Sequence, residues 1–427
     1  MFDFEMLDLP AHLKTRLKEL NFSEPTPIQN KAIPLALAGH DILGLAQTGT
    51  GKTLAFGLPL LNHVLNAPGK PEPKVAKSLI LAPTRELVNQ IAESLKQFTI
   101  GTKVRVMTVV GGQSINKQIQ LLGRGTDILV ATPGRLIDLL DRRAVTLKQA
   151  HYLVLDEADQ MLDLGFIHAL RRIAPELGTP RQTMLFSATM PKKMEELSSA
   201  YLKNPQRVQV SPPGKAADKI TQSVHFLAKA SKPGQLRDIL RQDPKAKTLV
   251  FGRTKHGTEK LMKSLVADGF RAVSIHGNKS QGQRDRAIAA FKAGDANILC
   301  ATDVAARGID IPDVMFVVNY DLPEVADNYV HRIGRTARAG RTGEAITLCS
   351  PEEIPLLRDI EKVMKIQVPV ASGEGMLAGF EPPAGAKKPA GRKRPHRGSR
   401  PSGGASAPGG NTDFRKRRKS GGQKKSA

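Results

Sequence analysis

The chain has 427 residues, 40% of them hydrophobic, which is long enough for two globular domains with packed cores. Its 64 Lys and Arg exceed its 40 Asp and Glu, and the net charge of +24 favours a polyanionic partner such as nucleic acid. No apolar run reaches the ~18 residues of a membrane span, and the acidic N-terminal segment has no apolar core typical of a secretory signal. We therefore expect neither a membrane protein nor a secreted one.

The basic charge is spread over the whole chain. Residues 371–427 hold 14 Lys and Arg against 3 Asp and Glu, so +13 of the +24 lies in the first 370 residues. The two cysteines, Cys300 and Cys349, sit in apolar runs and are predicted to be small buried hydrophobes. Two isolated cysteines suit a reducing compartment, so we expect a cytoplasmic protein.

Short apolar runs alternate with helical patterns through the first half of the chain. The runs predicted as strands are residues 41–45, 78–81, 104–109, 127–130, 152–155 and 183–186. Helical patterns between them include residues 54–61, 86–98 and 136–140. This alternation predicts an α/β fold, with a mostly parallel sheet flanked by helices on both faces.

A second set of alternating elements follows a break at residues 211–217, where Ser-Pro-Pro-Gly reads as a linker. Its predicted strands are residues 247–251, 271–275, 297–300, 314–318 and 345–348. Residues 78–95 and 248–265 also share a strand–turn–helix pattern with apolar residues at matching places, which indicates two similarly built lobes. We predict a first lobe at 1–210, a linker at 211–217 and a second lobe at 218–370.

Residues 371–427 are rich in Gly, Pro, Ser, Ala, Lys and Arg and have almost no large apolar side chains. Such a segment cannot offset its ordering entropy by burial, so we predict a disordered basic tail. Its clusters of Lys and Arg predict a salt-sensitive tether for RNA. A solubilising tail and a nuclear signal at residues 415–419 are the alternatives.

A phosphate-binding loop is predicted at residues 46–53, between a strand and a helical pattern. The sequence matches G-x-x-x-x-G-K-[ST] except at its first position, which is alanine. Backbone N–H groups would cradle phosphates, Lys52 would reach the β- and γ-phosphates, and the Thr53 hydroxyl would bind Mg²⁺. The predicted ATP-binding residues here are Ala46, Gln47, Thr48, Gly49, Thr50, Gly51, Lys52 and Thr53.

Three carboxylates crowd the end of the strand predicted at residues 152–155. In phosphate-binding-loop enzymes a strand-end aspartate helps to hold the Mg²⁺ of the nucleotide, a role that suits Asp156. Glu157 would then orient or activate the attacking water. The sequence therefore predicts ATP and Mg²⁺ as cofactors.

Residues 156–159 spell D-E-A-D, and with the phosphate-binding loop they resemble the DEAD-box family of ATP-dependent RNA helicases. Further resemblances follow in family order over residues 1–370, at 21–29, 83–87, 111–112, 132–135, 187–189, 251–254, 281–284, 301–310 and 331–338. One departure is Ala337, where the commoner family form has glycine. The resemblance implies two tandem RecA-like lobes, and the layout is similar to bacterial RhlE-like members.

The resemblance also implies roles for single residues. Phe22 and Gln29 would bind adenine, Asp310 would contact the ribose, and His331, Arg335 and Arg338 would be catalytic, the two arginines acting on the γ-phosphate. Ser187 and Thr189 would couple hydrolysis to strand separation. The residues implied in RNA binding are Thr84, Arg85, Gly112, Thr132, Gly134, Arg135, Arg253 and Thr302.

The implied activity is RNA-stimulated ATP hydrolysis, coupled to lobe closure, local unwinding of short RNA duplexes and ribonucleoprotein remodelling. An arginine finger contributes ~10³–10⁵ in rate, so closure of two lobes on ATP would gate hydrolysis. Ribosomal particles or RNA-decay enzymes are possible partners. The alternatives are an RNA-binding clamp or annealing factor with little unwinding, and a DNA helicase, which RNA-versus-DNA stimulation would distinguish.

Overall fold

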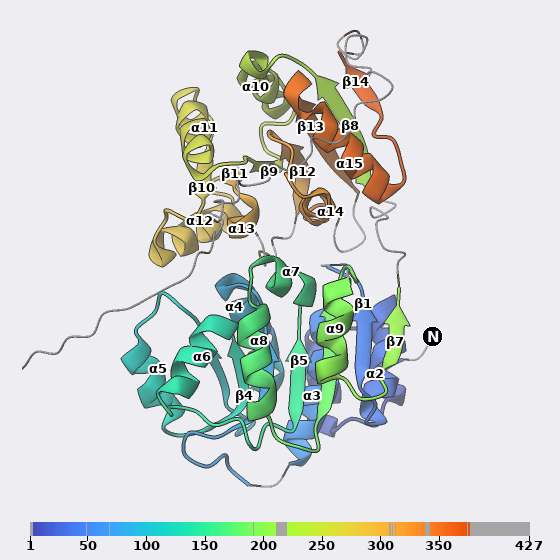
Figure 1. Cartoon of the computed structure of the whole chain (residues 1–427), viewed down its shortest axis with the longest axis vertical. Coiled ribbons are helices and arrows are strands. Elements are labelled where there is room, and N and C mark those ends of the chain that lie inside the picture. Colours follow the sequence, from blue (N-terminus) through green and yellow to red (C-terminus); the bar gives the residue numbers. More distant parts are fainter. Residues whose placement is uncertain are drawn as a thin grey trace, which may run out of the picture. The chain divides into compact units, whose positions relative to one another are not determined.

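The computed structural model describes residues 3–47, 49–67, 69–190, 192–210, 220–306, 309, 311, 313–337, 342–373 and 375. These residues form two α/β lobes, and each lobe is built on one seven-stranded sheet in which every strand pairing is parallel (Figure 1). The predicted fold class is confirmed. The predicted linker at 211–217 and the tail beyond residue 375 lie outside the described residues.

The sheet of lobe 1 has the order β3-β4-β2-β5-β6-β1-β7. Its strands are β1 (Ile42–Leu45), β2 (Ala76–Leu81), β3 (Val106–Val109), β4 (Thr126–Ala131), β5 (Tyr152–Leu155), β6 (Gln182–Ser187) and β7 (Gln206–Gln209). Its helices are α1 (Ala11–Glu19), α2 (Pro27–Leu37), α3 (Lys52–Asn66), α4 (Arg85–Thr99), α5 (Ile115–Leu122), α6 (Pro133–Asp141), α7 (Ala158–Asp163), α8 (Ile167–Ile173) and α9 (Lys192–Tyr201). Two 3₁₀ turns, η1 (Phe4–Met6) and η2 (Ala174–Glu176), complete the lobe.

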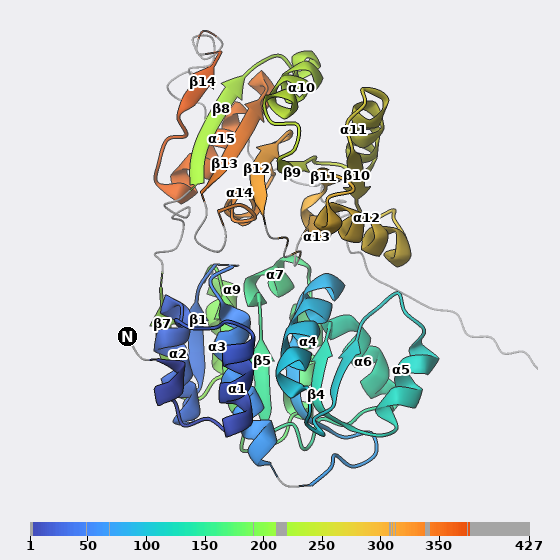
Figure 2. The ribbon, with the colours of Figure 1, turned by 180° about the vertical axis from the view of Figure 1, so that it is seen from behind.

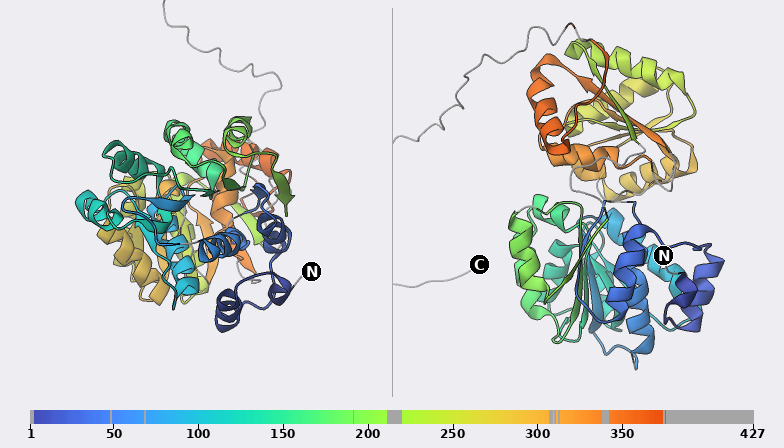
Figure 3. Two further views of the ribbon diagram at one scale, coloured as in Figure 1. Left: turned by 90° about the horizontal axis from the view of Figure 1, so that it is seen from below. Right: turned by 90° about the vertical axis from the view of Figure 1, so that its right-hand side faces the viewer.

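Helices cover both faces of this sheet, because successive strand residues point to opposite sides. Ile80 and Val154 pack with residues of α1 to α4, whereas Leu79 and Leu153 pack with residues of α6, α8 and α9. Figure 1 shows α6, α8 and α9 over one face, and Figure 2 shows α1, α3 and α4 over the other. The right-hand view of Figure 3 shows the sheet between the two helical layers. Burial on both faces explains the continuous apolar runs in the sequence.

Lobe 2 repeats the topology of lobe 1 with the order β10-β11-β9-β12-β13-β8-β14. Its strands are β8 (Ile220–Phe226), β9 (Lys247–Phe251), β10 (Ala272–Ile275), β11 (Ile298–Ala301), β12 (Val314–Asn319), β13 (Gly343–Cys349) and β14 (Val370–Ser372). Its helices are α10 (Lys232–Gln242), α11 (Lys255–Ala267), α12 (Gln281–Ala293), α13 (Asp303–Ala306), α14 (Ala326–Ile333) and α15 (Ile354–Met364), with the 3₁₀ turns η3 (Lys229–Ser231) and η4 (Pro351–Glu353).

The faint repeat in the sequence corresponds to equivalent elements of the two lobes. Strands β2 and β9 are both third in their sheets, and each leads into a helix, α4 or α11. Thr84 and Thr254 cap these helices by accepting hydrogen bonds from the N–H groups of Leu87 and Gly257. The prediction of two similarly built lobes is therefore confirmed.

The structure corrects several predicted bounds. Strands β5 and β9 match the prediction, but β7, β8 and β14 were not predicted. Strand β14 pairs with β8 as far as Ser372, so the chain leaves the sheet later than residue 371, where the sequence predicts the tail to begin. Cys300 and Cys349 are buried free thiols, as predicted. Within the described ranges, the helices are too short or too polar to cross a membrane.

Candidate nucleotide and nucleic-acid site

The predicted phosphate-binding loop connects the carboxyl end of β1 to the first residue of α3, Lys52. Gly49 and Gly51 adopt φ values of 85° and 92°, in the left-handed region that glycine enters without strain. A Cβ on Gly51 would lie 2.5 Å from Gln29 Nε2 and 2.9 Å from Thr26 Oγ1, so a larger residue there would displace these side chains. A glycine loop that ends at the N-terminus of a long helix suits an anionic ligand such as phosphate.

Lys52 and Asp156 form a buried ion pair beside this loop. Lys52 Nζ lies 3.3 Å from Asp156 Oδ1 and has no hydrogen-bond partner among the described residues. Burial acts to lower the pKa of Lys52, but the negative charges of Asp156, Glu157 and Asp159 outweigh it and raise the pKa. Burial raises the pKa of Asp156, against the opposing effect of Lys52. A buried ammonium group without a hydrogen bond fits a site for ligand phosphate oxygens.

The acids follow β5 directly. Asp156 Oδ1 accepts a hydrogen bond of 2.9 Å from the Glu157 N–H, and Glu157 is buried with a left-handed backbone at φ 52°. Thr53 is half-buried on the first turn of α3. Among the residues that the structure describes, no three His, Cys, Asp or Glu side chains gather as metal ligands would. Asp156 and Thr53 carry side-chain oxygens, the type of ligand that Mg²⁺ prefers.

Asp159 joins the acid cluster to the predicted coupling residues. Its Oδ2 accepts hydrogen bonds from the backbone N–H groups of Ala188 and Thr189 and from the Thr189 hydroxyl, at 2.9 to 3.1 Å. The Ser187 hydroxyl donates to the Thr189 carbonyl at 2.7 Å. Sequence reasoning gave no role to Asp159, although its place in the D-E-A-D motif was a signal that could have indicated one.

The predicted adenine-binding residues lie at α2 and the segment before it. Gln29 Nε2 donates to the Gly51 carbonyl at 3.0 Å, and Gln29 Oε1 accepts from the Thr26 N–H at 2.9 Å. Each amide atom keeps capacity for one more hydrogen bond. Phe22 is 39% exposed and, with Phe4, lines a pocket of about 420 Å³.

The RNA-binding residues predicted in lobe 1 follow three neighbouring strands. Thr84 and Arg85 follow β2, Gly112 follows β3, and Thr132, Gly134 and Arg135 follow β4. Parallel strands end at the same edge of a sheet, so these residues share the edge that carries the phosphate-binding loop and the acids. The structure thus places the loop and acids on β1 and β5, and the second set on β2, β3 and β4.

Arg85 lies at the centre of this second set. A Cβ on Gly112 would collide with the Arg85 guanidinium, and Arg85 Nη1 donates to Gln281 Oε1 of lobe 2 at 3.0 Å. Burial lowers the pKa of Arg85, and the charges of Arg284 and Arg135 act in the same direction, against that of Glu86. This concentration of guanidinium groups suits a phosphate backbone.

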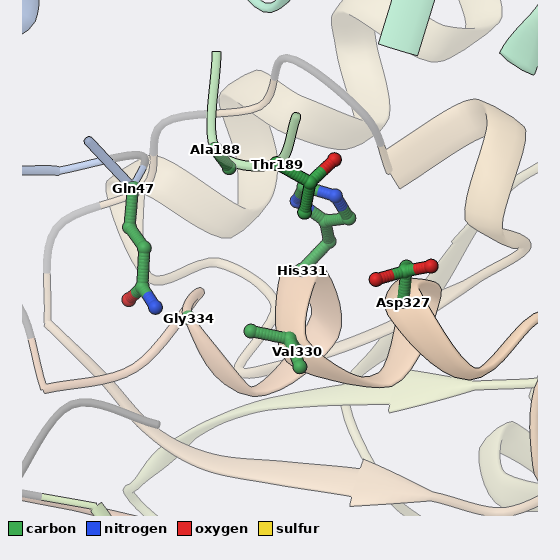
Figure 4. A pocket seen from close by; sticks show the side chains of 7 residues that line it. All are labelled: Gln47, Ala188, Thr189, Asp327, Val330, His331 and Gly334. Carbon is green, nitrogen blue, oxygen red and sulfur yellow. The ribbon is translucent and has the colours of Figure 1, made fainter. Parts of the chain in front are cut away.

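The predicted catalytic residues of lobe 2 lie on and after α14. Arg335 is buried, and its guanidinium donates to the carbonyls of His331 and Ile309 at 3.2 and 3.1 Å. His331 lines a small pocket of about 20 Å³ with residues of both lobes (Figure 4). The seven lining residues are Gln47, Ala188, Thr189, Asp327, Val330, His331 and Gly334. The predicted roles of Thr48, Asp310 and Arg338 fall on residues outside the described ranges.

Arg332 is a buried anchor that sequence reasoning missed. Its Nε and Nη2 donate to the two carboxylate oxygens of Asp303, at 2.5 and 2.7 Å, and its Nη1 donates to the Asp321 carbonyl at 2.6 Å. Nearby, Thr302 follows β11 and is half-buried, and Arg253 follows β9 with a side chain that is 37% exposed. Ala337 adopts φ 55°, which explains why glycine suits this position.

Comparisons with known proteins agree with this geometry. Residues 26–197 match the DEAD/DEAH box helicase family, and residues 231–340 match the helicase conserved C-terminal domain. The chain is 42% identical over 364 residues to DEAD-box ATP-dependent RNA helicase 30 of Arabidopsis thaliana. That alignment covers 85% of this chain but 62% of the longer plant protein.

Two solved structures are similar over nearly their whole length. S. cerevisiae Dbp5 bound to RNA and ADP BeF3 is 31% identical with a TM-score of 0.78, covering 86% of this chain and 95% of that chain. A DEAD box protein from the hyperthermophile Methanococcus jannaschii is 36% identical with a TM-score of 0.52, covering 87% of this chain and 99% of that chain. The predicted pair of tandem RecA-like lobes is confirmed, and the chain belongs to the DEAD/DEAH box helicase family.

Proposed function

We propose that the chain is an ATP-dependent RNA helicase that couples RNA-stimulated ATP hydrolysis to local unwinding of short RNA duplexes. The observation that carries this proposal is the shared carboxyl edge of the lobe 1 sheet. Lys52 and Asp156 follow β1 and β5 and form an ion pair at this edge. The predicted RNA-binding residues around Arg85 follow β2, β3 and β4 at the same edge. One sheet would therefore present both a phosphate site and a polyanion site at the same edge.

Residues of lobe 1 would hold ATP and Mg²⁺. The buried Lys52 ammonium and the N–H groups from Gly49 to Thr53 would bind phosphate oxygens, while Phe22 and Gln29 would bind adenine. Asp156 and Thr53 would hold Mg²⁺, which supplies charge neutralisation for the phosphates when it is bound. Glu157, buried next to Asp156, would orient the attacking water and accept its proton.

Residues of lobe 2 would complete the catalytic site. Arg335 and Arg338 would stabilise negative charge on the γ-phosphate, with His331 beside them, and Asp310 would contact the ribose. Since these residues follow the phosphate-binding loop by more than 250 positions and belong to the other lobe, hydrolysis would depend on lobe closure. RNA bound to both lobes would favour closure, which makes the ATPase RNA-dependent.

RNA would be bound through its sugar-phosphate backbone. The contacts would come from hydroxyls, backbone N–H groups and guanidinium groups, which suit phosphate and sugar rather than base edges. The residues that carry them are Thr84, Arg85, Gly112, Thr132, Gly134, Arg135, Arg253 and Thr302. The relative Dbp5, bound to RNA and ADP BeF3, supports both ligands for this chain. Ser187 and Thr189, tied to the acid cluster through Asp159, would couple hydrolysis to the bound strand.

Finer features are also part of the proposal. The first lobe would span residues 1–210, a linker at 211–217 would follow, and the second lobe would begin at residue 218 and include β14. The basic segment after Ser372 would form a disordered tether for RNA. The chain would be an RhlE-like bacterial member, cytoplasmic, and active on ribosomal particles or with RNA-decay enzymes. The basic composition supports the RNA tether, and the two buried free thiols suit a reducing compartment.

The test is ATP hydrolysis by the full chain with single-stranded RNA, with DNA of the same sequence, and without nucleic acid. We expect strong stimulation by RNA and loss of hydrolysis in Glu157→Gln, because the amide cannot accept a proton from water. Equal stimulation by DNA would favour a DNA helicase. RNA binding without hydrolysis would favour a clamp or annealing factor.

A further inference from the structure

Lobe 2 contains a buried ion pair whose function nothing above explains. Lys232, at the start of α10, is 1% exposed, and Glu353, at the end of η4, is 3% exposed. Lys232 Nζ donates to Glu353 Oε2 at 2.5 Å and to the Tyr320 carbonyl at 2.7 Å. Removing two charges from water is costly, and such a pair stabilises a fold little more than apolar residues would. A buried pair of this kind therefore suggests a role beyond packing.

The second carboxylate oxygen of Glu353 reaches a more exposed cation. Glu353 Oε1 accepts a hydrogen bond of 2.6 Å from Arg253 Nη2 and one of 3.2 Å from the Leu322 N–H. The Ser350 N–H and hydroxyl donate to Glu353 Oε2 at 3.2 and 2.9 Å. The carboxylate is thus held from several sides, and it links the buried Lys232 to Arg253, whose side chain is 37% exposed.

Arg253 is held so that part of its guanidinium faces outward. Its backbone N–H donates to Asp321 Oδ2 at 3.0 Å, and its side chain uses Nη2 for both Glu353 and the Leu322 carbonyl. Among the described residues, no hydrogen bond engages its Nε or Nη1. Nε and Nη1 lie on opposite sides of the guanidinium, so each is left as a separate donor for a ligand oxygen such as that of a phosphate.

We propose that Glu353 and Lys232 are positioning residues for RNA binding by lobe 2. Glu353 fixes the Arg253 guanidinium, and Lys232 fixes the Glu353 carboxylate and neutralises its charge. Arg253 then loses less side-chain freedom when it binds a phosphate, because its guanidinium is already held by Glu353. This inference rests on the proposed RNA-binding role of Arg253 and extends it to two residues that would not touch RNA.

The rival explanation is purely structural: the pair would only hold α10 against η4 and α15. A structural role predicts that removing the pair affects RNA binding in the same way whether or not Arg253 is present. A positioning role predicts that the effect on RNA binding disappears when Arg253 is absent. A double-mutant cycle separates these outcomes.

The experiment measures the RNA concentration for half-maximal ATPase stimulation, and kcat at saturating RNA, for the full chain and its variants. We expect Glu353→Gln to raise the half-maximal RNA concentration roughly threefold to tenfold, the range for losing the preorganisation of one charged side chain. We expect kcat to change less than about twofold, because Glu353 lies outside the catalytic residues. In an Arg253→Ala background, Glu353→Gln should have no further effect on the RNA requirement.

Two controls keep the result interpretable. Asp359→Asn removes the same charge from an exposed ion pair on α15 and should leave the RNA requirement unchanged. If circular dichroism shows that Glu353→Gln does not fold, Lys232→Met with Glu353→Gln removes both buried charges together and takes its place in the cycle.

The remaining outcomes separate the inference from the proposal beneath it. An equal effect of Glu353→Gln with and without Arg253, or no effect in either background, would overturn the positioning role. If Arg253→Ala alone leaves the RNA requirement unchanged, the proposed RNA-binding role of Arg253 fails first, and the positioning role fails with it.

Discussion

Asp159 shows how a single carboxylate can connect two functional segments. Its neighbours Asp156 and Glu157 belong to the proposed nucleotide site, while its own Oδ2 accepts three hydrogen bonds from Ala188 and Thr189. Hydrogen bonds to a charged acceptor are about twice as strong as neutral ones. A displacement of the acid cluster would therefore be transmitted to the segment after β6.

We expect Asp159→Ala to lower the free energy of unfolding by about 2 kcal/mol, because two backbone N–H groups lose a charged acceptor. We also expect it to reduce duplex unwinding per ATP hydrolysed. Urea denaturation and a strand-displacement assay measure the two effects. The matched control is Asp141→Ala, which removes an exposed ion pair with Arg172 and should cost less than about 0.5 kcal/mol. Equal effects of the two substitutions would contradict the linking role.

The difference between Lys52 and Arg332 indicates what sequence can reveal about single residues. Local spacing next to strand ends predicted that Lys52 and Asp156 serve one site, and the structure brings them together as a buried ion pair. The contacts of Arg332 and Asp159 could not be predicted, because Asp303 and Thr189 lie 29 and 30 residues away in the sequence and meet them only in the folded chain. Sequence reasoning recognised both motifs but could not see these contacts.

At the scale of elements, α11 and β10 are joined by a small polar cluster. Glu259 of α11 accepts hydrogen bonds from the Ser274 hydroxyl at 2.6 Å and from Lys279 Nζ, and it lies 3.0 Å from His276 Nε2. Burial acts to raise the pKa of Glu259, but the contacts with Ser274, His276 and Lys279 outweigh it and lower the pKa to about 2.

The lowered pKa of Glu259 determines in which direction the stability of the fold changes with pH. A carboxylate with a depressed pKa stabilises the fold above its ordinary pKa near 4.5, and this contribution is lost as the pH falls toward about 2. We expect Glu259→Gln to unfold at lower urea concentration than the parent at neutral pH. The difference should shrink between about pH 4.5 and the lowest pH at which both chains fold. A difference that stays constant over this range would contradict the role of the Glu259 charge.

The prediction of strands was most accurate where the strands are buried on both faces of the sheet. Strands β5 and β9 lie inside their sheets, and their bounds were predicted correctly. Strand β5 is apolar throughout, and β9 is apolar from Leu249 to Phe251. Strand β7 carries one buried residue and β14 carries none, because both lie at sheet edges. Strand β8 alternates buried and more exposed residues, a pattern that was available in the sequence but was not used.

At the scale of the whole chain, the two lobes share one strand order but carry different chemistry. Lobe 1 carries its acid pair after β5 and the predicted phosphate-binding loop after β1, whereas lobe 2 carries Arg335 after α14. The proposed function divides ATP and RNA contacts between the lobes, so each ligand would favour the same closed arrangement. Binding of the two ligands must then be linked, and the linkage must be reciprocal.

The most direct test of this account is the dissociation constant of single-stranded RNA, measured with and without a non-hydrolysable ATP analogue and Mg²⁺. The account predicts that the analogue tightens RNA binding by roughly 5- to 150-fold, and that RNA tightens binding of the analogue by the same factor. An RNA dissociation constant that does not change when the analogue is added would contradict it.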